Sequence, residues 1–131
     1  MNSSNRPHNP PQVFPPYRNY AHAVEVPAGS RTLYISGING YDATGEHLPD
    51  DFAGQVANVW ATLREILASA GMTFADLVSL RFFLTSADDD PANVAAIVEH
   101  LGASVAARTV VVQQLLEPAW RVEIEAVAAK I

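Results

Sequence analysis

Charged side chains are spaced along the last apolar segment of the chain so that they could take part in acid–base or anion-binding chemistry. Arg121, Glu123 and Glu125 occupy alternate positions of the segment 121–129, and apolar residues lie between them. Because successive side chains of a strand point to opposite faces, the three charged groups would share one face. Arg108 opens the preceding apolar segment, and it would stand at a comparable level if the two strands paired as an antiparallel hairpin.

Two interpretations of these residues remain open on the pattern alone. A guanidinium can donate two parallel hydrogen bonds to a carboxylate, so Arg108 could clamp an acidic substrate. A glutamate held nearby could orient or deprotonate a water molecule. The alternative is a cross-strand salt bridge without chemistry, which contributes less than about 1 kcal/mol to stability. Periodicity alone favours the salt bridge.

Other chemistries find less support in the sequence. Ser36 and Gly37 lie inside an apolar segment, but no G-x-S-x-G elbow surrounds them and no histidine stands at a defined offset. The chain has no cysteine, which excludes disulfides, thiolate metal sites and cysteine nucleophiles. The four histidines show no metal-ligand spacing, and no glycine motif typical of phosphate binding is present. We therefore expect no metal and no nucleotide cofactor.

The composition is typical of a single folded domain with an excess of acidic residues. The chain has 131 residues, of which 49% are hydrophobic and 17% charged, enough to bury a core without covalent staples. Its formal net charge of −6, with only eight lysines and arginines, weighs against a nucleic-acid partner. No apolar run approaches the roughly 20 residues that a membrane helix needs. We expect a cytoplasmic protein without membrane attachment.

The chain divides into a tail and one domain. Residues 1–16 contain five of the nine prolines and little apolar periodicity, which predicts an extended tail. Residues 17–131 form the predicted domain. Apolar periodicity predicts strands at 20–26, 32–38, 77–85, 108–116 and 121–129, with helices at 51–70 and 91–101.

The predicted elements indicate a fold class and a sheet with one face that no helix covers. The first two strands read as a hairpin, and Gly37 inside the second predicts a bulge or a close backbone approach. The order ββαβαββ predicts an α+β fold, a mixed sheet with two helices on one face. Since the other face is not simply polar, a second subunit is expected to cover it.

Four segments, taken in order, are similar to the RidA family of reactive enamine/imine intermediate deaminases. They are NYAHAV at 19–24, YISGINGYDATGE at 34–46, LREILASAGMTFADLVSLRFFLT at 63–85, and AARTVVV at 106–112 with VEIEAVA at 122–128. They resemble the family's PYSQAV, SGQ…TGE, helix-to-FLT, PART and VEIEA-x-A segments. The resemblance covers the chain from about residue 20 to residue 129.

The resemblance implies a chorismate-mutase-like homotrimer with a cleft at each subunit interface. It implies that Arg108 clamps the substrate carboxylate and that Glu123 positions the attacking water. Tyr20, Ser36 and Gly37 match the family's pocket residues. The family's cysteine two residues after the arginine is Val110 here, which makes that pocket wall apolar. The glutamine after the Ser-Gly pair is Ile38, which removes a polar contact.

The implied activity is hydrolysis of reactive enamines and imines, such as 2-aminoacrylate, to 2-keto acids and ammonia, with no cofactor. The partners are then an imino or keto acid and two further copies of the chain, with no nucleic acid and no membrane. The alternative function is a non-catalytic trimer that binds 2-keto acids in the same interface cleft.

Overall fold

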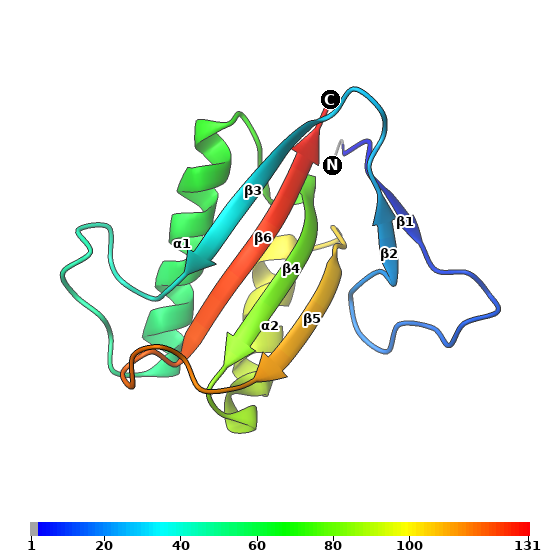
Figure 1. The fold of residues 1–131 in the computed structure, drawn as a ribbon. Coiled ribbons are helices and arrows are strands. Elements are labelled where there is room, and N and C mark those ends of the chain that lie inside the picture. The colour runs from blue at the N-terminus through cyan, green and yellow to red at the C-terminus, as the bar shows by residue number, and fades with distance from the viewer. Residues whose placement is uncertain (1–2) are drawn as a thin grey trace.

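Residues 3–131 are described by a computed structural model, whose centre is a four-stranded mixed sheet with two helices on one face (Figure 1). The strands are β3 (Arg31–Ile38), β4 (Leu77–Leu84), β5 (Ala107–Val112) and β6 (Val122–Lys130). Their order across the sheet is β3-β6-β4-β5, in which β6 runs antiparallel to both neighbours and β5 runs parallel to β4. The expected α+β class with two helices on one face of a mixed sheet is confirmed.

The two helices begin and end where local sequence signals predict. Helix α1 (Phe52–Ser69) starts after Asp51, whose Oδ1 accepts a hydrogen bond of 3.0 Å from the backbone N–H of Gly54. Gly71 follows this helix with a φ of 71°, the left-handed conformation that glycine adopts without strain. Helix α2 (Asp90–Leu101) contains a proline in its first turn, where no intrahelical donor is lost.

Short 3₁₀ turns lead into two of these elements. One is η1 (Phe74–Asp76) before β4, and the other is η2 (Ala87–Asp89) before α2. Thr73 and Asp76 exchange side-chain and backbone hydrogen bonds in a capping box, which fixes the entry into β4.

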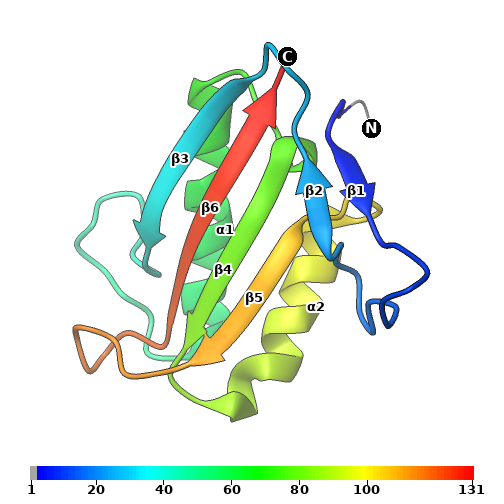
Figure 2. The same cartoon turned by 45° about the vertical axis from the view of Figure 1, so that its right-hand side comes forward.

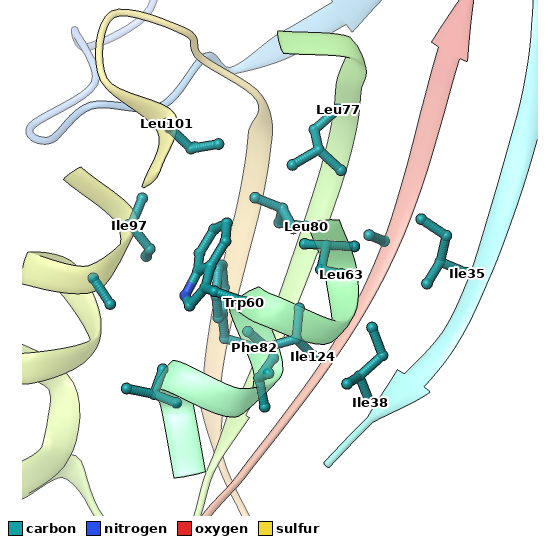
Figure 3. Packing of buried hydrophobic residues seen from close by; sticks show 14 of the residues in the cluster. Ile35, Ile38, Trp60, Leu63, Leu77, Leu80, Phe82, Ile97, Leu101 and Ile124 are labelled. Carbon is teal, nitrogen blue, oxygen red and sulfur yellow. The ribbon is translucent and has the colours of Figure 1, made fainter. Parts of the chain in front are cut away.

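The hydrophobic core lies between the helices and the sheet (Figure 3). Trp60 of α1, Phe82 of β4 and Ile124 of β6 are completely buried there. Burial of each such side chain stabilises the fold by about 1.5–3 kcal/mol. This packing presents the alternate residues of β4 and β6 to the opposite, open face of the sheet.

The predicted hairpin between residues 20–26 and 32–38 is wrong. The strand β2 (Ala23–Glu25) pairs instead with β1 (Arg6–His8) in a separate two-stranded sheet beside β5 (Figure 2). β3 pairs with β6 at the other end of the chain. The pairing differs because β3 contributes buried side chains to the hydrophobic core, whereas β2 is largely exposed and contributes no side chain to it.

The N-terminal segment is extended, but it is not free of regular structure, because it supplies β1. The predicted boundary between a tail at 1–16 and a domain at 17–131 stays a prediction, and residues 1–2 lie outside the described part. Within residues 3–131, no helix is both long and apolar enough to cross a membrane. The cytoplasmic location stays a prediction.

Candidate functional site

The six residues singled out from the sequence fall into two groups on opposite faces of the sheet. β5 and β6 are not neighbours, because β4 lies between them, so the hairpin that would place Arg108 beside Glu123 does not form. Arg108 pairs in register with the buried Leu80 and shares its helix-facing side. Glu123 alternates with buried residues of β6 and projects to the open face.

The first group lies in a cleft of about 390 Å³ at the outer edge of β5. Its lining includes Tyr20, Arg108 and Val110, together with residues from the start of α2. The backbone N–H of Ala21 donates a 3.1 Å hydrogen bond to the carbonyl of Ala106, which holds the segment carrying Tyr20 against the start of β5. The structure therefore brings these three predicted residues together.

Arg108 is held in this cleft by neutral partners. Its Nη1 donates a 3.1 Å hydrogen bond to Oδ1 of Asn19, and its guanidinium lies 5.4 Å from the centre of the Tyr20 ring. Among residues 3–131, no carboxylate forms an ion pair with it. Burial in the cleft lowers the pKa of Arg108, and the nearby Arg18 lowers it further. The Asp90 carboxylate opposes this lowering of the pKa without forming an ion pair with Arg108. A half-buried guanidinium that forms no direct ion pair is suited to bind an anion.

A second arginine lines the same cleft. Nη1 of Arg18 lies 2.9 Å from Oδ2 of Asp90, in the first turn of α2. This hydrogen bond is the main cause that raises the pKa of Arg18 above its ordinary value. The pair joins the segment before β2 to the helix across the cleft.

The second group lies where β3 and β6 meet on the open face. The register of the two strands shifts between Ile35 and Ile38, which is the irregularity predicted at Gly37. A Cβ added at Gly37 would collide with the Glu123 carboxylate and lie 2.9 Å from its Cδ. Nδ2 of Asn39 donates a 3.3 Å hydrogen bond to Oε1 of Glu123. Ser36 is exposed in the same bulge.

Salt bridges form at the other two charged residues of the predicted last strand, Arg121 and Glu125. Arg81 and Glu125 are paired in register on adjacent strands, with Arg81 Nη1 2.8 Å from the glutamate Oε1. Arg121 forms hydrogen bonds of 3.1 and 3.2 Å from Nη2 to the two carboxylate oxygens of Asp89. Glu123 has no arginine partner among the described residues, so it remains available for chemistry.

The two groups cannot act together within one chain. Through the strand register, Arg108 stands level with Ala126, three positions along β6 from Glu123. The two residues are separated by two strand spacings across the sheet and by three residues along the strand, which puts their Cα atoms about 14 Å apart. The side chains of Arg108 and Glu123 also point to opposite faces of the sheet.

Sequence reasoning missed three polar residues that belong to these two groups. Asn19 holds Arg108, Asn39 holds Glu123, and Arg18 adds a second cation to the cleft. Each lies within two residues of a predicted site residue, and this closeness in the sequence is the signal that could have identified it. No group of three or more histidine, aspartate or glutamate side chains within residues 3–131 is arranged to hold a metal ion.

The family model described as Endoribonuclease L-PSP matches residues 11–130 of the sequence. The chain belongs to this family. The relatives that follow carry Rid and imine deaminase names, which confirms the predicted membership of the RidA family.

Sequence relatives of this Rid protein include an imine deaminase. The 2-iminobutanoate/2-iminopropanoate deaminase of Capra hircus is 32% identical over 112 residues, covering 85% of this chain and 80% of the relative. Protein DfrA of Myxococcus xanthus is 30% identical over 109 residues, covering 83% of each chain.

The solved structures of Rid proteins share the fold. YyfB from Yersinia pestis, described as a Rid protein of unknown function, superposes with a TM-score of 0.79 at 39% identity, over 95% of this chain and 97% of that chain. RidA from the Antarctic bacterium Psychrobacter sp. PAMC 21119 superposes with a TM-score of 0.71 at 29% identity, over 86% and 89% of the two chains.

Proposed function

We propose that this Rid protein is a cofactor-independent deaminase that hydrolyses 2-imino acids to 2-keto acids and ammonia. The observation that carries the proposal is the half-buried guanidinium of Arg108, which faces a cleft and has no carboxylate partner among the described residues. The imine deaminase name of the Capra hircus relative supports the same reaction.

In this proposal Arg108 binds the carboxylate of the imino acid and orients its C=N carbon. Water adds to that carbon while the Glu123 carboxylate accepts one of its protons, and this proton passes to the imine nitrogen to give the neutral carbinolamine. The hydroxyl proton of the carbinolamine is then transferred to its amino group, which leaves as ammonia while the C=O bond of the 2-keto acid forms. Asn39 holds Glu123 by a 3.3 Å hydrogen bond, so it acts as a positioning residue.

The reaction also requires that Arg108 and Glu123 approach one substrate. Because they lie on opposite faces of one sheet, we propose that the working site forms between copies in a homotrimer, with one copy supplying Arg108 and the next supplying Glu123. The open face of the sheet, which carries Tyr34 at 81% exposure, would then be covered by neighbouring copies.

The deciding experiment compares wild type with Arg108→Ala in an assay that generates imino acids with a flavin amino-acid oxidase and follows ketoacid formation. We expect wild type to accelerate formation of the 2-keto acid, and Arg108→Ala to lose at least about 100-fold of that acceleration because the clamp is gone. The matched control is Arg64→Ala, an exposed arginine on α1 that does not line the cleft and lies over the Phe74 ring instead, which should keep full activity.

Two results would contradict the proposal. An Arg108→Ala variant with wild-type activity contradicts the clamp assignment. A wild-type protein that binds 2-keto acids without accelerating hydrolysis contradicts the deaminase and favours a binding trimer. Size-exclusion chromatography of both variants checks that assembly is unchanged.

A further inference from the structure

The cleft that contains Arg108 holds a second positive charge, which the proposed reaction does not use. Arg18 lines the cleft together with Arg108, and its charge is close enough to lower the pKa of Arg108. The whole chain has only eight lysines and arginines against fourteen acidic residues. Asp90 also lines the cleft and pairs with Arg18, so the three charged side chains leave one net positive charge for a negatively charged ligand.

Asp90 neutralises Arg18 only in part. It accepts one hydrogen bond, from Nη1, and within residues 3–131 the other N–H groups of the Arg18 guanidinium form no hydrogen bond. The side chains of Arg18 and Asp90 are 39% and 31% exposed, so their ion pair is screened by water and weak. A ligand carboxylate can therefore share or replace Asp90 at little cost.

The walls between the two arginines are apolar. Val110 and Val112 of β5 and Val94 of α2 line the same cleft. Such walls suit the methylene groups of an aliphatic chain, whereas the two guanidinium groups suit acidic groups at its ends. A ligand with a single carboxylate would satisfy Arg108 and leave Arg18 with the exposed Asp90 as its anionic partner.

We propose that Arg18 is a specificity residue that binds the distal carboxylate of a dicarboxylic 2-imino acid whose first carboxylate is held by Arg108. This inference rests on the proposed function, since it assumes that Arg108 is the clamp. It names the substrate class of that site: acids with a second anionic group beyond a short aliphatic chain.

The test uses stable 2-keto acids in place of the labile imines. Isothermal titration calorimetry compares 2-oxoglutarate with 5-methyl-2-oxohexanoate, in which two methyl groups replace the distal carboxylate oxygens. Wild type should bind 2-oxoglutarate about tenfold more tightly, as expected for one charge-assisted carboxylate contact. In Arg18→Met, which keeps the aliphatic stem, that ratio should fall to about one.

Two further variants separate recognition from a structural role. Asp90→Asn releases Arg18 and should increase the preference for 2-oxoglutarate above the wild-type ratio. If Arg18 served only to hold the segment before β2 against α2, both Arg18→Met and Asp90→Asn would weaken the two ligands equally, which would overturn the proposal. Arg64→Met, remote from the cleft, should keep the wild-type ratio.

The outcome also distinguishes this inference from the proposed function. If 5-methyl-2-oxohexanoate binds and Arg108→Ala abolishes its binding, but 2-oxoglutarate is not preferred, the clamp stands and the role of Arg18 is wrong. If neither keto acid binds to wild type, both proposals are wrong. A preference that survives in Arg18→Met likewise overturns the inference.

Discussion

Gly37 leaves room for the Glu123 carboxylate at the bulge in β3, because it has no side chain. Glu123 occupies the space that a Cβ would fill, and Asn39 donates to its other oxygen. Arg108 is placed in a comparable way by Asn19 and the Tyr20 ring. At the scale of single residues, each proposed catalytic group is oriented by neutral neighbours that do not cancel its charge.

A Gly37→Ala substitution tests the close approach. The added methyl meets the far end of a flexible side chain, so Glu123 can swing aside, and the free energy of unfolding should change by less than about 1 kcal/mol. Deaminase activity should fall by at least about tenfold, because the carboxylate is no longer held over the bulge. Urea denaturation and the coupled assay measure the two effects.

Gly40→Ala is the matched control for this substitution. Its Cβ would lie 2.6 Å from the Cα of Gln55, a backbone atom that cannot rotate away. We expect it to lower the free energy of unfolding by more than about 2 kcal/mol. Full activity in Gly37→Ala would contradict the role given to Glu123.

At the scale of elements, one buried amide joins α1 to the entry of β6. Gln55 is completely buried, and its Nε2 donates to the carbonyls of Pro49 and Ala119 at 2.8 and 3.0 Å. Its Oε1 accepts a 2.8 Å hydrogen bond from the backbone N–H of Arg121. These three bonds fix the loop that leads into the strand carrying Glu123.

Gln55→Leu should therefore be costly despite its similar size. It leaves three partly buried backbone groups without partners, and we expect the free energy of unfolding to fall by about 3 kcal/mol. Asn58→Leu, one turn along α1, removes a single bond to the carbonyl of Gly40 and should cost about 1 kcal/mol. Equal effects in urea denaturation would show that the Gln55 network does not hold this loop.

At the scale of the whole molecule, the open face of the sheet and the loop after β5 present apolar groups to solvent. Tyr34 on the open face and Leu116 in the loop are 81% and 89% exposed. Exposed apolar groups of this size favour association with further copies. In the homotrimer that we propose, neighbouring copies would cover these groups, and the same assembly would bring Arg108 of one copy near Glu123 of another.

Mixing two inactive variants tests this arrangement. If the site forms between copies, co-refolding Arg108→Ala with Glu123→Gln places an intact Arg108 beside an intact Glu123 at about a quarter of the sites. Activity should recover to about that fraction of wild type, measured by the coupled assay on the isolated trimer. Each variant refolded alone is the control, and a mixture as inactive as its components would contradict a shared site.

Interactions between residues close together in the chain explain which features could be predicted from the sequence alone. The predicted helix at 51–70 agrees closely with α1, because the cap at Asp51 and the positive φ of Gly71 depend only on residues close in the sequence. Gly37 predicted the irregular strand for a similar local reason. Arg108 and Glu123 were candidate site residues because their side chains are charged. Membership of the Rid family followed from the ordered segments that contain these residues.

The pairing of the strands, and the sheet face on which each candidate residue lies, became known only from the three-dimensional fold. β3 joins β6 across nearly the whole chain, and β4 inserts between β5 and β6, because buried side chains must meet the two helices. Strand pairing depends on such long-range burial, which periodicity within one segment does not encode. For that reason Arg108 and Glu123 lie on opposite faces, and Arg18 joins Arg108 at the cleft.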